Sequence, residues 1–399
     1  MRLKEILSKY FKGDKVIWGV IFALSAFSLL AVYSSTGTLA YKYQGGNTAY
    51  YIIKHFVLLA VGIGVIYLTH LIPYKYYSGL SQFFLYLSIF LLAITLVMGT
   101  SLNQASRWLT LPGLGFTIQT SDFAKLALIM YIARVLSMRQ DEEKINDLNG
   151  FIVNLILPVC VICALIMPAN LSTALLLAIT SFILMFIGRV KIKYLASIAI
   201  IGLMAIALIF AGIKLSGKNV GRFATWEKRV ESFISGESQD NYQADLSRKA
   251  IASGGFLGKG PGNSIQRNFL PHPYSDFIYA IIIEEYGFVG GALILFLYLF
   301  LLYRAGVIVR KSTRTFAAFL AIGLTISLVF QAMVNMGVAV NIFPVTGQTL
   351  PLVSMGGSSI LFTGVAFGII LSVSRSIEKE EENILQTESN IESVEDDNE

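Results

Sequence analysis

The sequence predicts an all-α, polytopic membrane protein. Of its 399 residues, 55% are hydrophobic and only 14% are charged, and the mean hydropathy is +0.66. This composition excludes an ordinary soluble globular domain. The apolar residues form long continuous runs, whereas the strands of a membrane β-barrel show short segments of alternating hydrophobicity. Within lipid, such continuous runs satisfy their backbone hydrogen bonds only as helices.

About ten of these runs are long enough to cross a bilayer, because a spanning helix needs roughly 20 apolar residues. The fourth run is the least regular, since Asp122, Lys125 and Arg134 interrupt it. The predicted spans are residues 16–35, 51–70, 78–98, 116–137, 150–167, 171–188, 194–213, 276–303, 316–340 and 356–374.

Basic residues gather in the N-terminal segment and in the connections after the sixth and eighth spans. These segments fall on one side of the membrane, which the positive-inside rule makes cytoplasmic, with both termini there. The long loop after the seventh span is also basic, but loops of that length largely escape the rule. The first apolar run is too long for a cleavable signal peptide, so we expect a signal anchor.

The predicted organisation has three parts. Residues 1–15 form a cytoplasmic N-terminal segment, residues 16–377 a membrane domain of about ten helices, and residues 378–399 a cytoplasmic tail. Within the membrane domain, residues 214–275 form a large extracytoplasmic loop between the seventh and eighth helices. The tail is acidic and poor in apolar residues, which predicts disorder.

The cysteines, Cys160 and Cys163, lie together inside one predicted span. Their C-x-x-C spacing has no nearby histidine and no thioredoxin-like context. We therefore interpret them as packing residues and not as a redox or zinc site.

The long loop combines basic and aromatic side chains. Its basic residues include Arg222, Lys228, Arg229, Arg248, Lys249, Lys259 and Arg267. A basic, amphipathic segment at the interface suits anionic lipid headgroups or a phosphate-bearing ligand. The alternative is a positively charged surface helix without a specific ligand.

Residues 252–262 are rich in glycine and resemble a phosphate cradle at first glance. The order of a Walker loop is absent, because Lys259 is followed by Gly260. Alternatively, the glycines allow a tight fold that another helix or a ligand approaches closely. Both interpretations remain open.

Asp276 stands where this polar loop meets the eighth span. Because Ser275 is a good N-cap, we expect Asp276 in the first helical turn, where the helix dipole favours a carboxylate. Stabilisation of the helix is one hypothesis. The other is catalysis, since an acid at the membrane rim could serve as a base for a water-soluble hydroxyl group.

Other charged residues are expected inside the membrane domain. Glu284 and Glu285 lie some two turns deeper in the eighth span, where pairing with a cation or backbone donors is favoured over a proton relay. Asp122 and Lys125 share one helical face and can pair, or they frame an anionic pocket with Arg107. Residues 343–359 contain prolines, glycines and hydroxyls, which predict irregular backbone lining a cavity.

Taken in order, these motifs resemble the SEDS family of bacterial cell-wall polymerases, the FtsW and RodA glycosyltransferases. The resemblance extends from about Gly13 to Ser376. It rests on Ala105-Ser-Arg-Trp-Leu, Gln119-Thr-Ser-Asp-Phe-Ala-Lys125, Tyr242-Gln243, Gly254-Gly255-x-x-Gly258-x-Gly260, Leu270-Pro-x-x-x-x-Asp276-Phe-Ile, Glu284-Glu285-x-Gly287, Asn335-Met-Gly, Pro344-Val-Thr-Gly and Leu350-Pro-x-x-Ser-x-Gly-Gly-Ser-Ser.

The chain departs from the family pattern at two places. Gln119-Thr-Ser-Asp122 replaces a common Q-P-S-E, and Ala169-Asn170 replaces a common P-D. These departures put the roles of those positions in doubt, whereas the region of Asp276 is intact. The sequence is more similar to the division (FtsW) branch than to the elongation (RodA) branch.

The resemblance implies an inverting glycosyltransferase that polymerises lipid II, a disaccharide-pentapeptide on undecaprenyl pyrophosphate. It makes Asp276 the candidate general base. The implied substrate-binding residues are Arg107, Lys125, Arg229, Gln243 and Ser358, of which the three cations would stabilise the departing pyrophosphate. Asp122, Glu284 and Glu285 are implied to be structural or supporting residues.

No metal-ligand cluster is visible in the sequence, although Mg²⁺ or Mn²⁺ could share the charge of the pyrophosphate. The implied partners are a class B penicillin-binding protein, other cell-division proteins and membrane lipids, with no nucleic acid. Three alternatives remain: a lipid II flippase or transporter, an elongation-type polymerase, and a non-catalytic scaffold for cell division.

Overall fold

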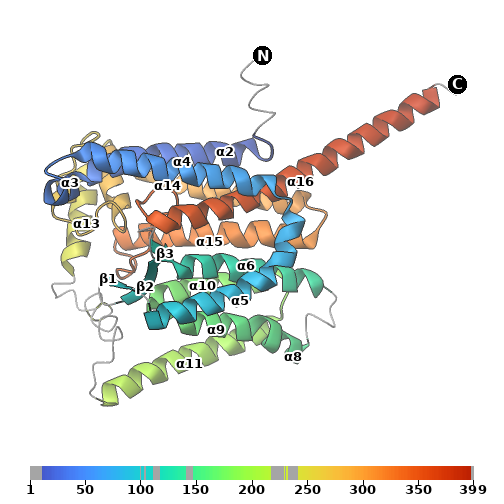
Figure 1. The fold of residues 1–399 in the computed structure, drawn as a ribbon, viewed down its shortest axis with the longest axis horizontal. Helices are drawn as coiled ribbons and strands as arrows, with labels where there is room; N and C mark the ends of the chain where they lie inside the picture. The colour runs from blue at the N-terminus through green and yellow to red at the C-terminus, as the bar shows by residue number, and fades with distance from the viewer. Residues whose placement is uncertain are drawn as a thin grey trace.

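The computed structural model describes residues 11–98, 100–102, 105–110, 117–140, 147–216, 229, 231 and 241–396. Most of the predicted N-terminal segment and much of the predicted 214–275 loop, including Arg222 and Lys228, lie outside the described residues. Within them, the helices run alongside one another in a bundle (Figure 1). The bundle helices are α2 (Lys15–Ser35), α4 (Thr48–Leu71), α5 (Tyr74–Met98), α6 (Thr120–Met138), α8 (Leu148–Phe151), η1 (Ile152–Ile156), α9 (Leu157–Ile166), α10 (Leu171–Ile187), α11 (Ile192–Ser216), α14 (Ile278–Lys311), α15 (Thr315–Ala339) and α16 (Gly357–Asp396).

Among the described residues, seven helical segments are long and apolar enough to cross a membrane. One of them is continuous from α8 through the π-helical turn η1 to α9. The helix α10 and residues 192–205 of α11 are shorter apolar helices, and α6 occupies the fourth predicted span. Every predicted span therefore coincides with a helix, and the prediction of a polytopic helical membrane protein is confirmed.

The ends of the bundle differ. Figure 1 shows α3 (Gly37–Tyr43), α13 (Asn241–Gly254) and a small sheet at one end, whereas the far part of α16 projects beyond the other. At the latter end, Asp14 caps α2 by accepting from Val16 N at 2.8 Å and pairs with Arg304 of α14. The backbone N–H of Asp14 donates to Ser374 Oγ at 3.0 Å. These contacts join α2, α14 and α16.

Two features of the fold differ from the prediction. A three-stranded antiparallel sheet of β1 (Thr100–Leu102), β2 (Ala105–Thr110) and β3 (Thr117–Gln119) precedes α6, where the fourth span was expected to begin at residue 116. The described part of the acidic tail continues α16 as helix to Asp396, where disorder was predicted. Glu and Lys favour helix, and Glu380 and Glu381 bond to Thr313 and Lys311.

The cysteines lie in α9, and the packing interpretation fits Cys163 but not Cys160, which is exposed. Both are free thiols. Cys163 is partly buried, and its Sγ lies 3.5 Å from the carbonyl oxygen of Ala174 in the neighbouring helix α10.

The helix α14 is interrupted at Gly287, whose φ of 69° and ψ of −169° are not helical. The glycine-rich segment fills the interruption with backbone hydrogen bonds. Lys259 N and Gly260 N donate to the carbonyls of Glu284 and Glu285, at 3.0 and 2.9 Å. In return, Phe288 N of α14 donates to the carbonyl of Gly255 at 2.9 Å. The loop and the helix thus exchange the bonds that an unbroken helix would form within itself.

This docking favours the second interpretation of the glycines, close approach of a helix. A Cβ atom on Gly254 would lie 2.1 Å from the carbonyl oxygen of Ile283, and one on Gly287 would lie 2.3 Å from that of Phe256. Backbone oxygens cannot move away as a flexible side chain can, so these positions accept only glycine.

Replacing Gly258 with alanine should lower the thermal unfolding midpoint of the detergent-purified protein more than replacing Gly262 does. Both residues have positive φ, 82° and 78°, so each substitution carries a cost of roughly 1–2 kcal/mol for left-handed backbone. Only at Gly258 would the methyl group also lie 2.2 Å from a backbone oxygen, that of Glu285, whereas the space at Gly262 is open. Equal midpoints for the two variants would contradict the close docking.

Candidate active site

Asp276 lies in the turn that leads into α14. The helix begins at Ile278 with Phe277 in the capping position, so Asp276 precedes the first helical turn in which it was predicted. Ser275 does not cap the helix, because its hydroxyl donates to Asp276 Oδ1 at 3.1 Å. The side chain of Asp276 is half-buried, which leaves part of it accessible at the end of the bundle.

The backbone around Asp276 is held by three consecutive carbonyl groups. The carbonyl of Tyr274 accepts from Met355 N at 2.9 Å, and that of Ser275 accepts from Ser354 Oγ at 2.6 Å. The carbonyl of Asp276 itself accepts from Asn335 Nδ2 at 3.0 Å. Two of these donors come from the segment between α15 and α16 and one from α15, so distant parts of the sequence fix the backbone that carries the carboxylate.

The segment between α15 and α16, residues 340–356, has irregular backbone, as predicted. Polar side chains from the helices bond to its main chain. Asn335 Nδ2 also donates to the carbonyl of Gln348 at 2.7 Å, and Gln331 Nε2 donates to that of Thr349 at 2.9 Å. The side chain of Gln348 reaches Thr173 Oγ1 of α10 at 2.7 Å.

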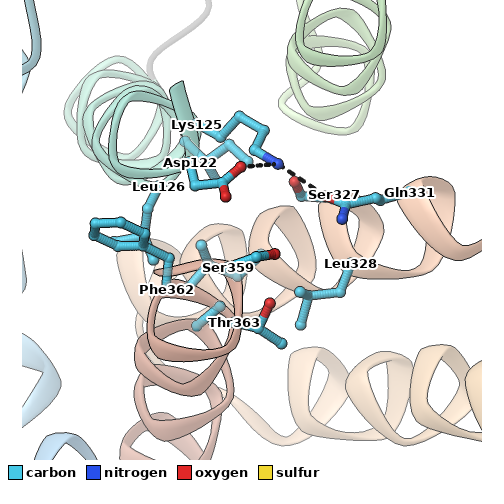
Figure 2. Close-up of a pocket in the computed structure, with 12 residues that line it drawn as sticks. Asp122, Lys125, Leu126, Ser327, Leu328, Gln331, Ser359, Phe362 and Thr363 are labelled. Atoms are coloured by element: carbon cyan, nitrogen blue, oxygen red, sulfur yellow. Dashed lines mark hydrogen bonds and ion pairs between the residues drawn. The ribbon is translucent and has the colours of Figure 1, made fainter. Parts of the chain in front are cut away.

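Asp122 and Lys125 form the predicted pair, with Lys125 Nζ 2.8 Å from Asp122 Oδ1. Both side chains are buried, 6% and 8% exposed. Figure 2 shows the ammonium group between Asp122 of α6 and Gln331 of α15, whose Oε1 accepts from it at 2.9 Å. Gln331 therefore connects the pair to the irregular segment.

The pair lines a small cavity of about 30 Å³ between α6, α15 and α16. The other wall carries Ser359, Phe362 and Thr363 (Figure 2). Asp122 Oδ2 is buried without a hydrogen-bond partner among the residues that the structure describes. The cavity has room for a water molecule, for which about 10–15 Å³ suffices.

Glu284 and Glu285 both accept hydrogen bonds from cationic, hydroxyl or backbone donors, as expected from the sequence in preference to a proton relay. Glu284 is 0% exposed and accepts from Lys259 Nζ at 2.7 Å, from Ser264 Oγ at 2.5 Å and from two backbone N–H groups. Glu285 accepts from the hydroxyl of Ser34 and from Ser264 N. These bonds hold the segment after the glycines against α14 and α2.

The remaining predicted site residues lie in separate elements of the fold. Arg229 Nη1 donates to the carbonyl of Val345 at 3.0 Å, so Arg229 contacts the irregular segment. Ser358 is buried, and its hydroxyl accepts from Gln119 N at 3.0 Å. Gln243 lies half-buried on α13. Arg107 belongs to β2, but its side chain is outside the described part of the structure.

Tyr274 lies beside the candidate base. Burial, and then the negative charge of Asp276, raise the pKa of the Tyr274 phenol above its usual value. The phenol oxygen is 3.3 Å from Nδ1 of His272. A raised pKa keeps this phenol neutral over the physiological range, so it does not add a second negative charge next to Asp276.

The structure reveals supporting residues that sequence reasoning missed, chiefly Gln331 and Ser354. Gln331 and Asn335 are four residues apart in an otherwise apolar helix, and this spacing of polar side chains is the signal that would have found them. Among the described residues no group of three His, Cys, Asp or Glu could hold a metal ion.

The fold and the buried polar network define a class, that of multi-pass helical membrane proteins with a kinked α14 and an irregular, partly buried segment between α15 and α16. Two solved structures share this fold. One is described as a peptidoglycan synthase complex that coordinates polymerization and crosslinking, with a TM-score of 0.69 at 26% identity over 92% of this chain and 98% of that chain. The other is a mutant of the rod shape determining protein RodA from Thermus thermophilus, with a TM-score of 0.64 at 25% identity over 91% and 97%.

The particular family follows from the sequence comparison. The family model for FtsW, RodA and SpoVE, described as a cell cycle protein, matches residues 14–379. A probable peptidoglycan glycosyltransferase FtsW of Trichlorobacter lovleyi is 32% identical over 382 residues, which cover 94% of this chain and 97% of the relative. This chain therefore belongs to the FtsW/RodA/SpoVE family, as the motifs predicted.

Replacing Lys125 with methionine should destabilise the protein by about 3–5 kcal/mol, because Asp122 would keep a buried, unpaired charge. The double variant Asp122→Asn, Lys125→Met should be more stable than this single variant. Lys311→Met is a matched control, since the Lys311–Glu381 pair is exposed and such pairs contribute within about 1 kcal/mol. The thermal unfolding midpoint in detergent measures the stability of the three variants. A Lys125→Met protein as stable as Lys311→Met would contradict the buried pair.

Proposed function

We propose that this chain is an inverting peptidoglycan glycosyltransferase that polymerises lipid II into glycan strands at the outer face of the cytoplasmic membrane. The proposed setting is septal wall synthesis during cell division. Family membership supports the reaction class, as does the probable peptidoglycan glycosyltransferase FtsW that covers nearly the whole chain. The observation that carries the proposal is the half-buried Asp276. Its own carbonyl and the two carbonyls before it each accept a hydrogen bond from a donor elsewhere in the fold.

In the proposed reaction, Asp276 accepts the proton of the 4-hydroxyl group of one lipid-linked sugar as that oxygen attacks the anomeric carbon of the growing chain. The bond to undecaprenyl pyrophosphate breaks and the configuration at this carbon inverts. A positioned carboxylate contributes to such a step when it lies within hydrogen-bond reach of the hydroxyl. The rigid backbone of residues 274–276 would keep it there between turnovers.

The departing pyrophosphate needs positive charge. Arg107, Lys125 and Arg229 are the proposed sources, although Lys125 already neutralises Asp122 and Arg229 already bonds to Val345. Lys125 would therefore contribute as part of the Asp122 pair and not as an isolated cation. Gln243 and Ser358 are proposed to contact substrate. The hydroxyl of Ser358 also accepts a hydrogen bond from the backbone of Gln119, the last residue of β3.

We also propose that both termini are cytoplasmic, in keeping with the positive-inside rule, and that the chain works with a class B penicillin-binding protein. The solved complex that coordinates polymerization and crosslinking supports the latter. Other division proteins and membrane lipids are further proposed partners. An elongation-type polymerase, a lipid II transporter and a non-catalytic scaffold are the competing functions.

Asp276→Asn should abolish glycan formation from purified lipid II by the protein co-purified with its penicillin-binding protein. Loss of a general base costs about 10²–10⁴-fold in rate. Asp245→Asn is a matched control, because Asp245 is an exposed acid of α13 paired with Arg248. We expect long strands from the wild type and the control.

The other outcomes distinguish the alternatives. Equal activity of Asp276→Asn and wild type would remove Asp276 as the base. A wild-type complex that carries lipid II across vesicles and never polymerises it would favour the transporter. A complex that does neither would favour the scaffold.

A further inference from the structure

The irregular segment contains a residue in an unfavourable conformation close to the candidate base. Leu352 has a φ of 61°, in the left-handed region that residues with a Cβ rarely adopt. Its side chain is buried, 2% exposed. Ser354 and Met355, which donate to the carbonyls of Ser275 and Tyr274, lie two and three residues after it. Such conformations persist only where the surroundings hold them, and they concentrate at functional sites.

Two buried hydroxyl groups hold the turn from either side of Leu352. The phenol of Tyr298 in α14 donates to the carbonyl of Pro351 at 2.5 Å. The hydroxyl of Ser28 in α2 donates to the carbonyl of Val353 at 2.7 Å. Both side chains are 0% exposed. Two helices far apart in the sequence thus fix the carbonyls that flank the left-handed residue.

Ser28 has a second partner that fixes its direction. His55 Nε2 of α4 lies 2.7 Å from Ser28 Oγ. Because the Ser28 proton goes to the carbonyl of Val353, the Ser28 oxygen must accept, and His55 Nε2 must carry a proton. His55 is fully buried, and its Nδ1 has no hydrogen-bond partner within the described residues. His55 therefore acts as a donor that orients the serine.

We propose that Ser28, His55 and Tyr298 are positioning residues for Asp276. They hold the Leu352 turn, and the turn in turn holds Ser354 and Met355 against residues 274 and 275. This inference rests on the proposed function, since it assigns the three residues to the placement of the proposed base. We call the hydrogen bonds from Ser28 and Tyr298 to the Leu352 turn the clamp. Without the clamp, Leu352 can leave the left-handed region, and the Asp276 carboxylate moves with the turn. A displacement of about 1 Å at a reacting group can cost roughly 10²-fold in rate.

The test compares variants of the complex with its penicillin-binding protein in lipid II polymerisation. Ser28→Ala and Tyr298→Phe should each lower kcat, by about tenfold or more, with little change in KM for lipid II. Ser25→Ala is the matched control, because Ser25 lies one turn away on α2, is buried, and has no hydrogen-bond partner among the described residues. It should behave as wild type.

The His55 variants test whether His55 acts by donating a hydrogen bond to Ser28. His55→Leu should lower kcat, whereas His55→Gln should keep most of it, because the glutamine amide can donate to Ser28. Ser28→Ala combined with His55→Leu should be no slower than Ser28→Ala alone, since His55 acts through Ser28. A simple packing role would give additive losses and no rescue by glutamine.

Two sets of results would separate failure of this inference from failure of the proposed function. If the wild type polymerises lipid II and Asp276→Asn does not, but Ser28→Ala and Tyr298→Phe match Ser25→Ala, the clamp is overturned. A higher KM at unchanged kcat also overturns it. If the wild type makes no glycan, the proposed function fails instead. Should Ser28→Ala not fold, Tyr298→Phe carries the same test, because it frees the other carbonyl.

Discussion

The chain between α15 and α16 leaves helical geometry, and its residues 350–354 are buried among the helices. The backbone polar groups of this buried part must find partners there. An unsatisfied carbonyl or N–H group is expensive in such surroundings. Side chains of the surrounding helices therefore bond to this main chain, among them Gln331, Asn335, Ser28 and Tyr298. The position of Asp276 depends on this requirement, because the segment between α15 and α16 and the side chain of Asn335 in α15 hold the backbone of residues 274–276.

The same constraint explains the interruption of α14. At Gly287 the helix cannot complete its own hydrogen bonds, and the glycine-rich segment supplies them from outside. Glu284 and Glu285 then bind the chain that follows the glycines, with Lys259 and Ser264 as principal partners. Buried carboxylates in this part of the protein thus serve to attach a loop to a helix. Asp276 differs from them in being only half-buried.

Much of the fold could be predicted from the sequence because its signals are local. Apolar runs predicted a helix in every expected span, and seven of the described helical segments are long and apolar enough to cross a membrane. The three-residue spacing of Asp122 and Lys125 predicted their contact. The prolines and glycines of residues 343–359 predicted irregular backbone. The sheet could not be predicted in this way, since strands as short as β1 and β3 have no clear period. The helical tail was missed because composition was given more weight than the helix propensity of its glutamates.

The site was only partly predictable, because its geometry is set by contacts between distant segments. Asp276 and Asn335 were noted as separate motifs, but their hydrogen bond joins residues 59 positions apart. The expectation that Ser275 caps α14 failed because its hydroxyl and carbonyl are both engaged elsewhere. The glycine-rich segment admitted two interpretations, and only the docked helix distinguishes them. Local patterns therefore identify the residue types of the site, whereas long-range packing decides what each one does.

The most direct test of the central claim is an experimental structure of the protein with a non-reactive lipid II analogue in the acceptor position. If the irregular segment between α15 and α16 places the base, the acceptor 4-hydroxyl should lie within about 2.6–3.2 Å of the Asp276 carboxylate. The hydrogen bonds from Asn335, Ser354 and Met355 to residues 274–276 should remain. An acceptor hydroxyl that faces a different base, with Asp276 out of hydrogen-bond reach, would contradict the account.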